Sequence, residues 1–533
     1  MEKLGLNEIR RRFRDFYVNK EHYAAKSASL IPQNDKSLLI INSGMAPLKP
    51  YFSGVETPPA RRMTTCQKCI RTGDIDNVGK TARHGTFFEM LGSFSFGDYF
   101  KEESLKWGWE FITENLNMPK DKIWATVYEN DQEAYDLWLK IGMPEEHIVK
   151  LGKDDNFWEI GLGPCGPCSE LYYDRGEEYG CGKPDCKPGC ECDRYIEFWN
   201  HVFTQFSKEE DGSYSNLAHP NIDTGMGLER LACIMQGVDS IFDIDTIKHI
   251  LDAVAKKANV KYNSGDEKAD ISLRIVTDHL RSTVFMISDG ILPGNTGRGY
   301  VLRRLIRRAV RHGKLLGIEE KGFLSSLVDE VIEVSGEAYT EIAEKRDYII
   351  KIIRVEEEQF GKTLQKGINI LNEYTEELNS NGKTELDGEH AFKLYDTYGF
   401  PVEVTEEILS EYGKTVDMDG FKAHMQKQKE LAQKGRASTE DEAWKDASEY
   451  DSLPATEFTG YDSVCSEAKI LYIGDYDKEH KFIIFDKTPF YATGGGQLHD
   501  IGKIYCQETE ISVVDVKKEN GIYLHIINLA RPL

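Results

Sequence analysis

Two segments of the chain carry arginines that could bind the phosphates of a nucleotide. Residues 66–100 predict a strand, a loop and a second strand, with Arg71 ending the first strand and His84, Phe88 and Glu89 on the second. A guanidinium binds phosphate through a fork of donors, and a phenyl ring stacks on a base. The pattern indicates a nucleotide site; the alternative is a hairpin with a surface arginine and core phenylalanines.

The second segment, residues 221–237, predicts a strand that turns into a helix. Gly225 and Gly227 would permit a tight turn, and the helix is expected over Leu228–Met235. Arg230 would leave the first helical turn, where the positive end of the helix favours phosphate. A helix start with a solvent-exposed arginine is the alternative.

The loop Gly73–Thr81 is similar to a phosphate-binding P-loop, but its spacing differs. Five residues separate its two glycines, whereas the phosphate cradle requires four. Two aspartates in the loop would also repel phosphate. These features argue against a P-loop nucleotide hydrolase.

Residues 298–314, RGYVLRRLIRRAVRHGK, predict a basic helix in an acidic protein. The net charge is −24, so contact with nucleic-acid phosphates would require a local basic surface. One or two of the arginines are expected to pair with the surplus acids instead. The arginines of the expected basic face are Arg303, Arg304, Arg307, Arg308 and Arg311.

Four cysteines within twelve positions predict a metal site in a segment rich in glycine and proline. They are Cys181, Cys186, Cys190 and Cys192. Four thiolates suit tetrahedral zinc, although the spacing C-x4-C-x3-C-x-C is not a standard zinc pattern, and free thiols are the alternative. Cys165 and Cys168 are expected in a turn that lines the active site, and Cys66 and Cys69 as packing residues.

The elements that must position these residues follow from hydrophobic periodicity. An amphipathic helix is expected at the N-terminus, with Ile9, Phe13, Phe16 and Tyr17 on its apolar face. Lys101–Leu116 also predicts a helix. Strands are expected at Leu38–Asn42, Ile123–Tyr128 and Tyr195–Phe206. Alternating strands and helices of this kind indicate a mixed α+β domain.

Three domains are expected, over residues 1–241, 242–453 and 454–533. From Asp245 onward the helical period dominates, and one long helix presents Ile349, Ile352, Ile353, Phe360, Leu364, Ile368 and Leu371 on one face. A polar linker is expected at residues 433–453. After Pro454, short runs such as KFIIFD and ISVVDV predict a small β-barrel-like domain.

The composition is that of an ordinary globular protein. Of the 533 residues, 40% are hydrophobic and 29% are charged. No apolar run approaches the roughly 18 residues of a membrane span, and Met1–Arg12 lacks the apolar core of a secretory signal. We therefore expect a cytoplasmic protein without membrane contact, whose eleven cysteines are reduced thiols or metal ligands.

The ordered motifs resemble those of class II aminoacyl-tRNA synthetases, and among them the alanine-specific enzymes of bacterial type. The matching runs are DNVGKTARHGTFFEMLGSFSFGDYF, GPCGPCSE, DTGMGLERLA, RGYVLRRLIRRAVRHG, LYDTYGFPVEVT and TPFYATGGGQ. They extend over essentially the whole chain. The resemblance implies a catalytic domain built on an antiparallel sheet, followed by a helical domain that recognises tRNA.

The resemblance also implies roles for individual residues. Arg71 corresponds to the arginine that holds the ATP α-phosphate and the substrate carboxylate, and Arg230 to the one on the ATP tail. His84 and Phe88 match the adenine side, with Gly225 and Gly227 in the ATP-binding motif. The alanine pocket is expected from Asp223, which would bind the ammonium group, and from Trp158 and Asn200 around the methyl group.

The implied reaction has two steps and needs ATP with Mg²⁺. Alanine attacks ATP to give alanyl-adenylate and pyrophosphate, and the end of alanine tRNA then takes the alanyl group. Asn295 and Asp396 match the residues that sense a G·U wobble pair, and the five arginines of the basic helix would grip the acceptor stem. A tRNA-binding paralogue without activity is the alternative function.

Some positions depart from the usual pattern of these enzymes. Ser93 replaces an Asn, Gly85 replaces a larger residue, Gly161-Leu162 stand where a Thr is typical, and Thr493-Gly494 replace Glu-Ser. The His-x-x-x-His and Cys-x-x-x-His pairs of a hydrolytic editing site do not occur between Pro454 and Leu533. We therefore expect a chain that charges tRNA without correcting its errors, and one that is monomeric.

Overall fold

The computed structural model describes residues 2–33, 35, 38–159, 162–190, 192–428, 453–460, 463–476, 480–492, 499–506, 509–519 and 521–528. Residues 433–452 of the expected linker, the departures at Gly161 and at Thr493-Gly494, and the end of the TPFYATGGGQ run lie outside this set. None of the helices in these ranges combines the length and hydropathy of a membrane span.

A nine-stranded sheet is the centre of the first part of the chain, in the order β1-β2-β3-β9-β8-β7-β4-β5, with β6 paired to β7. Pairing is antiparallel except between β1 and β2 and between β4 and β5. The strands are β1 (Tyr23–Ala24), β2 (Arg62–Ile70), β3 (Phe87–Phe96), β4 (Ile123–Tyr128), β5 (Ile148–Leu151), β6 (Phe157–Trp158), β7 (Gly163–Asp174), β8 (Tyr195–Lys208) and β9 (Tyr214–Gly227).

Two of the three predicted strands are confirmed, as β4 and as most of β8. The prediction for Leu38–Asn42 is wrong, because this segment pairs only at single points: the Ile41 N–H donates to the Leu30 carbonyl at 3.0 Å, and the Ile41 carbonyl accepts from Ile70 at 2.9 Å. Ile40 and Ile41 are nevertheless buried. The apolar run predicted burial correctly and strand pairing incorrectly.

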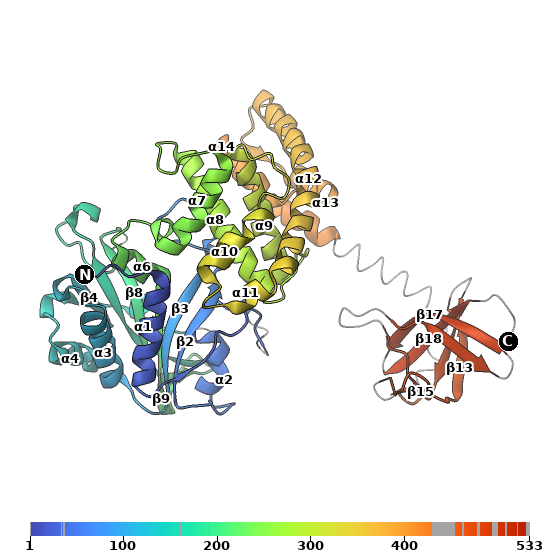
Figure 1. Cartoon of the computed structure of the whole chain (residues 1–533), viewed down its shortest axis with the longest axis horizontal. Helices are drawn as coiled ribbons and strands as arrows, with labels where there is room; N and C mark the ends of the chain where they lie inside the picture. Colours follow the sequence, from blue (N-terminus) through green and yellow to red (C-terminus); the bar gives the residue numbers. More distant parts are fainter. Residues whose placement is uncertain are drawn as a thin grey trace. The chain divides into compact units, whose positions relative to one another are not determined.

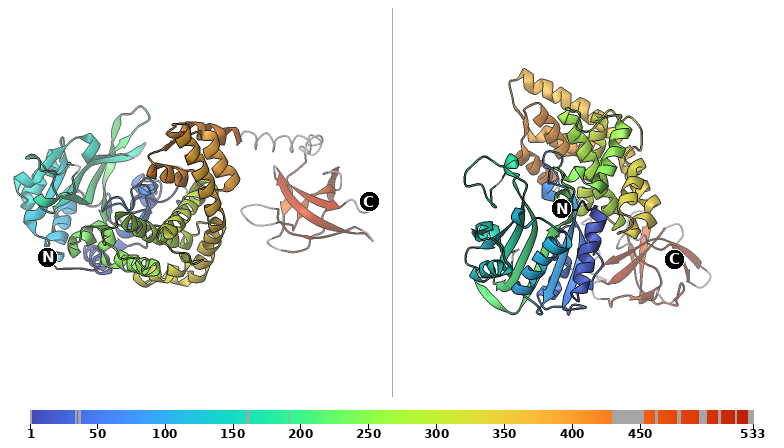
Figure 2. Two further views of the ribbon diagram at one scale, coloured as in Figure 1. Left: turned by 90° about the horizontal axis from the view of Figure 1, so that it is seen from above. Right: turned by 60° about the vertical axis from the view of Figure 1, so that its left-hand side comes forward.

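Helices flank the sheet and fix its strands. Helix α1 (Leu6–Asn19) buries the predicted apolar face, including Ile9 and Phe13, and packs against β2, β3 and helix α6 (Leu228–Gln236) (Figures 1 and 2). The helix predicted at Lys101–Leu116 is present as α3 (Lys101–Glu110) followed by a π-helical turn. The remaining short helices are α2 (Lys49–Phe52), α4 (Gln132–Ile141) and α5 (Lys153–Asn156).

The region after the sheet is helical, as predicted. Its long helix α12 buries Ile349, Ile353, Phe360, Leu364 and Leu371, so the predicted apolar face is confirmed at these positions. The helices are α7 (Asp245–Ala258), α8 (Glu267–Ser288), α9 (Gly297–Leu315), α10 (Val328–Ser335), α11 (Thr340–Glu344), α12 (Arg346–Ser380), α13 (Gly388–Tyr398) and α14 (Val402–Glu411). A short parallel pair joins β10 (Glu385–Leu386) to β11 (Thr415–Val416).

The β domain near the C-terminus is an antiparallel sheet in the order β13-β14-β18-β17-β16. Its strands are β13 (Ile470–Asp475), β14 (His480–Phe485), β16 (Gly502–Cys506), β17 (Thr509–Glu519) and β18 (Ile522–Asn528), with a separate pair of β12 (Glu457–Phe458) and β15 (Lys487–Thr488). Alternate residues of β14 enter two different apolar clusters, so both faces are covered. Among the described strands no β13–β16 pairing closes a barrel.

Residue contacts divide the chain into two compact units. The first contains Met1–Asn381 and Leu394–Glu411, and the second contains Gly382–Lys393 and Tyr412–Leu533. The sheet of nine strands and most of the helices therefore belong to one unit. The division after residue 241 stays a prediction.

Candidate nucleotide and amino-acid site

Arg71 lies where the sequence predicted it, directly after strand β2. Its backbone N–H donates to the Thr86 carbonyl at 3.0 Å, which holds the two ends of the hairpin together. Its guanidinium carbon is 4.8 Å from the centroid of the Phe88 ring on β3. An exposed arginine that faces a ring across a hairpin is therefore present, with its charge open to an incoming anion.

His84 is not on the second strand, which corrects the prediction. Strand β3 begins at Phe87, and His84 lies in the preceding loop. Its Nδ1 is 2.7 Å from the Thr81 hydroxyl. Burial lowers the pKa of His84 below that of a free imidazole. The neutral form of the ring is therefore favoured at physiological pH, and this form makes hydrogen bonds and ring contacts rather than ion pairs.

Arg230 leaves the first turn of helix α6, as predicted, and is held in place by Glu197 of strand β8. The Arg230 Nη1 donates to the Glu197 carboxylate at 3.0 Å and to the Glu197 carbonyl at 3.2 Å. Both side chains are partly exposed, at 29% and 37%. The pair therefore leaves donors of Arg230 accessible.

The reason given for Gly225 and Gly227 is wrong, because neither adopts the left-handed backbone that favours glycine. A Cβ on Gly225 would lie 2.9 Å from the sulfur of Met90, so a side chain there would require the flexible Met90 side chain to shift. A Cβ on Gly227 would meet only Arg230, at an ordinary 3.5 Å. Packing against Met90, and not the turn, is therefore what constrains position 225.

One cleft collects most of the predicted nucleotide residues. Arg71, Phe88, Gly225, Gly227 and Arg230 all line it. Sequence reasoning missed four charged residues that line the same cleft, which are Asp74, Arg83, Glu197 and Glu229. Three arginines around one cleft make it suited to a polyanion such as a triphosphate.

Strand register places the predicted amino-acid pocket on the same face of the sheet. Gly225 lies opposite Asn200, and Asp223 lies opposite Val202 of β8 and Phe94 of β3. Residues two apart on a strand share a face, and so do directly opposed residues. Asp223 and Asn200 therefore point to the side of the sheet on which Gly225 lines the cleft.

Asp223 and Trp158 have the properties expected of such a pocket. Asp223 is 8% exposed, and burial raises its pKa to about 7. A buried carboxylate of this kind gains when a cation arrives. Trp158 lies on β6 and packs against the cluster of Met45, Phe52 and Phe94, and Phe94 is the neighbour of Asp223.

Two acidic residues beside the cleft, Glu170 and Glu197, were not identified from the sequence. Glu170 of β7 accepts hydrogen bonds from Asn200 at 3.0 Å and from Tyr172 at 2.7 Å. Burial and the neighbouring charge of Glu197 raise the pKa of Glu170 to about 8. In the sequence, each is an isolated acid in a strand rich in aromatic residues, which could have marked it as a candidate. Only the pairing of β7 with β8 shows that Glu170 and Glu197 are neighbours.

The basic helix, α9, is less open than predicted, because every arginine of the expected face has an acidic partner. Arg308 and Arg311 are buried, at 4% and 3% exposure, and both contact Glu407. The other pairs are Arg303 and Arg307 with Glu356, Arg304 with Asp76, and Arg311 with Glu411. Arg303, Arg304 and Arg307 remain partly accessible to an external phosphate, with side chains 22%, 16% and 14% exposed.

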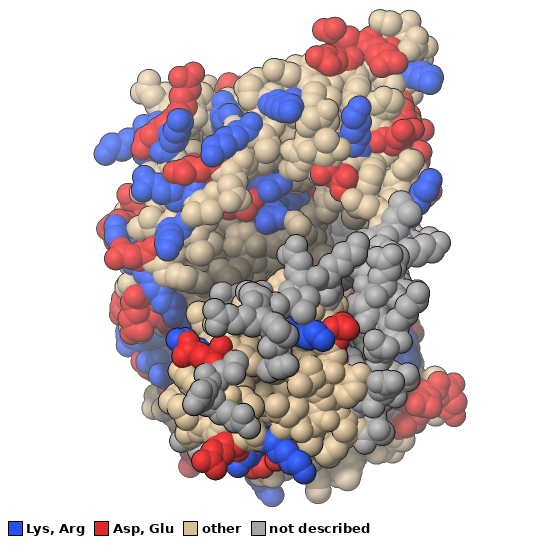
Figure 3. Space-filling model, turned by 90° about the vertical axis from the view of Figure 1, so that its right-hand side faces the viewer, with Lys and Arg blue, Asp and Glu red and all other residues tan. Residues whose placement is uncertain are grey.

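Asn295 and Asp396, the predicted tRNA-reading residues, are both exposed. Asn295 precedes α9 and accepts a hydrogen bond from Arg303. Asp396 lies on α13. On the face drawn in Figure 3, lysines and arginines are interspersed with aspartates and glutamates, and no broad basic surface is seen there.

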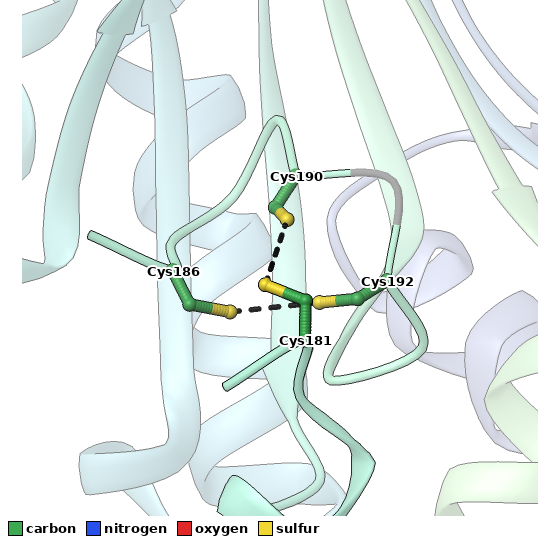
Figure 4. A group of neighbouring side chains, drawn as sticks. All are labelled: Cys181, Cys186, Cys190 and Cys192. Carbon is green, nitrogen blue, oxygen red and sulfur yellow. Dashed lines mark hydrogen bonds between the residues drawn. The ribbon is translucent and has the colours of Figure 1, made fainter. Parts of the chain in front are cut away.

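The four predicted metal-binding cysteines converge in space. Their sulfur atoms all lie within 4.8 Å of one another, and the side chains point inward from one loop (Figure 4). Cys181 and Cys190 are 3.6 Å apart and Cys186 and Cys192 are 3.5 Å apart. Tetrahedral zinc, with bonds of about 2.3 Å, places its sulfurs about 3.8 Å apart, so the donor set fits zinc.

The other cysteines follow the predictions only in part. Cys165 and Cys168 lie on strand β7 and are buried, so the turn predicted for them is wrong. Cys69 is buried on β2, as expected for a packing residue. Cys66, beside it, contacts the Glu89 carboxylate at 3.1 Å.

A mainly antiparallel sheet with an arginine-bearing hairpin and a Gly-x-Gly strand-helix defines a class II synthetase, and the comparisons agree. The family model described as tRNA synthetases class II (A) matches residues 8–532, so the chain belongs to this family. It is similar to the alanine–tRNA ligase of Alkaliphilus metalliredigens (strain QYMF), with 60% identity over 98% of this chain and 61% of that protein.

Two further relatives carry the same description. The alanine–tRNA ligase of Alkaliphilus oremlandii (strain OhILAs) is 59% identical over 97% of this chain and 60% of that protein. That of Clostridioides difficile (strain 630) is 59% identical over 99% of this chain and 61% of that protein. The chain thus spans about three fifths of the length of these curated relatives.

Proposed function

We propose that this chain activates L-alanine with ATP and transfers the alanyl group to alanine tRNA. One observation carries the proposal: the cleft lined by Arg71, Phe88 and Arg230 lies on the sheet face that also holds Asp223 and Asn200. A triphosphate and a small amino acid would be neighbours there. The similarity to alanine–tRNA ligases supports alanine as the amino acid.

In the first step, an oxygen of the alanine carboxylate attacks the α-phosphorus of ATP and pyrophosphate leaves. Asp223 would bind the alanine ammonium, and Arg71 would neutralise the carboxylate and the α-phosphate. Phe88 would stack on adenine, and Arg230 would hold the leaving phosphates. The protein mainly orients the reactants and stabilises charge in this scheme.

Glu170 and Glu197 fit the magnesium ion that accompanies ATP. They are adjacent carboxylates, and their mutual repulsion contributes to the raised pKa of Glu170. A divalent cation relieves such repulsion and favours oxygen ligands. Bound there, Mg²⁺ would supply positive charge to the phosphates.

In the second step, a hydroxyl of the terminal adenosine of tRNA attacks the adenylate carbonyl, and AMP leaves. Asn295 and Asp396 would read the G·U pair in the acceptor stem, whose wide minor groove displays base edges. Arg303 and Arg304 would add phosphate contacts. Arg307, which like Arg303 pairs with Glu356, would add a further contact through its partly exposed side chain.

The four-cysteine loop would hold one structural zinc ion. Its four thiolates would close the coordination sphere, as in structural rather than catalytic zinc sites. The loop lies beside the cleft, because Cys190 and Gly189 line a second depression together with Glu197 and Arg230. Zinc would therefore stabilise a wall next to the phosphate end of the site.

Charging of tRNA transcripts tests the proposed function. The chain is expected to attach labelled alanine to an alanine tRNA with a G·U pair in its acceptor stem, and to charge a G·C variant of the same transcript far less. Equal charging of both transcripts would reject the recognition role of Asn295 and Asp396. No charging of either transcript, with intact alanine activation, would limit the function to adenylate formation.

A further inference from the structure

The back of strand β3 carries a buried cluster of charges that the proposed reaction does not use. Because side chains alternate along a strand, Glu89 points away from the cleft that its neighbour Phe88 lines. Glu89, Glu229 and Arg281 are 1%, 4% and 4% exposed, and Glu229 also reaches the lining of the cleft. Arg10 and Arg281 supply the positive charges that face the two carboxyl groups.

Arg281 of helix α8 joins the two segments that form the cleft. Its Nη2 lies 2.8 Å from Glu229 of α6 and 3.3 Å from Glu89 of β3. Its Nη1 donates to the Phe87 carbonyl at 3.3 Å, and its guanidinium lies over the Phe87 ring at 4.6 Å. Five donors in a planar fork allow one arginine to make all of these contacts.

Two further contacts hold the start of β3 and the residue before it. One turn earlier on α8, the carboxylate of Asp278 accepts a hydrogen bond from the Thr86 N–H at 2.7 Å. Glu229 accepts from the Glu89 N–H at 3.0 Å. The backbone of residues 86–89 is therefore fixed from α8 and from α6 at once.

The cluster is rigid because Glu89 is also held from its other side. Two nitrogens of Arg10 contact its carboxylate at 2.7 Å each, and the Tyr339 hydroxyl donates to it at 2.7 Å. Burial opposes ionisation, but Arg10 outweighs it and lowers the pKa of Glu89 to about 2. The group therefore stays charged at all physiological pH values.

We propose that Arg281 is a positioning residue for ATP: it fixes the distance between Phe88, next to Glu89, and Arg230, next to Glu229. The inference rests on the proposed function, since those two side chains would hold the adenine and the phosphates. A buried arginine without this role would add general stability only. The alanine pocket at Asp223 has no contact with Arg281 in the described residues, so alanine binding is largely independent of it.

The test is alanine-dependent pyrophosphate exchange with the Arg281→Met variant, which keeps the packing on Phe87 and removes the charge. The KM for ATP is expected to rise roughly tenfold, because the side chains that would hold adenine and the phosphates would lose their proper spacing and bind ATP more weakly. The KM for alanine should stay within about twofold. Arg281→Lys keeps the positive charge but lacks the planar fork of donors. Its KM for ATP should lie between those of wild type and Arg281→Met.

The matched control is Arg346→Met, which removes an arginine bound through two contacts, at 2.6 and 2.7 Å, to Asp329 on the surface. It should leave both KM values unchanged. Arg281→Met leaves the Glu229 carboxyl group without its arginine partner. The double variant Arg281→Met/Glu229→Gln therefore also replaces this carboxyl group by a neutral amide. It should recover thermal stability and keep the raised KM for ATP.

The outcomes separate this proposal from the proposed function. Exchange by wild type that is absent or independent of alanine would reject the function itself. A folded Arg281→Met variant whose KM for ATP matches wild type, or whose kcat alone falls, would overturn the positioning role. Loss of folding in both the single and the double variant would show that Arg281 serves stability in general, and would overturn it too.

Discussion

Asp223 should make alanine binding depend on pH near neutrality. Its burial raises its pKa to about 7, and only the ionised carboxylate pairs with the alanine ammonium. The ionised fraction falls from about nine tenths at pH 8 to about one tenth at pH 6, and apparent affinity scales with the competent fraction. The KM for alanine should therefore rise about tenfold between pH 8 and pH 6.

The same burial predicts a change in stability of known sign. A carboxyl group whose pKa is higher in the folded than in the unfolded chain binds more protons when folded, so the free energy of unfolding falls as pH rises from about 4 to about 7. With the ordinary pKa at 3.8 and the folded value at about 7, the loss between pH 5.5 and pH 8 is about 2 kcal/mol. Asp223→Asn removes this loss.

Two measurements check the prediction for Asp223. The KM for alanine in pyrophosphate exchange, taken at saturating ATP from pH 6 to pH 8, should follow a pKa of about 7 in wild type. Asp223→Asn should bind alanine roughly 10- to 100-fold more weakly, without this dependence, and should gain more thermal stability at pH 8 than at pH 5.5. A wild-type KM that is flat with pH, or an equal stability change at both pH values, would refute the reasoning.

Three further predictions concern other parts of the proposed site. Arg71→Ala should lower the rate of pyrophosphate exchange by roughly 10²–10³ with an unchanged thermal midpoint; near-wild-type exchange would reject its role. Asn295→Ala and Asp396→Ala should each impair tRNA charging and spare exchange, and equal losses in both assays would contradict the division of labour. Elemental analysis of protein purified without chelator should give one zinc per chain, and Cys190→Ser should lower this content; a zinc-free wild type would contradict the assignment.

Local patterns predicted the arginine hairpin well, because its geometry is set by neighbouring residues. Arg71 and Phe88 face each other across the hairpin formed by β2 and β3. The strand-loop-strand pattern of the sequence indicates this hairpin directly. The apolar run at Leu38–Asn42 predicted burial but could not distinguish a strand from a buried loop. His84 fell outside the strand because the loop that precedes β3 is longer than its pattern indicated.

Contacts between distant segments were beyond sequence reasoning. Arg308 and Arg311 find their acids about 100 positions later, on α14, so a face predicted as open is largely buried. Glu170 and Glu197 become neighbours only through the register of β7 and β8. The four cysteines were found because their spacing is short, so the chain itself keeps them close.

Alanine-dependent exchange of pyrophosphate into ATP by the purified chain tests the central claim most directly. The reverse of adenylate formation carries labelled pyrophosphate into ATP only when the correct amino acid, ATP and Mg²⁺ occupy the site together. We predict exchange with L-alanine, weaker exchange with glycine and serine, and none with valine or leucine, whose larger side chains the proposed pocket beside Trp158 would exclude. No exchange with alanine, or equal exchange with leucine, would contradict it.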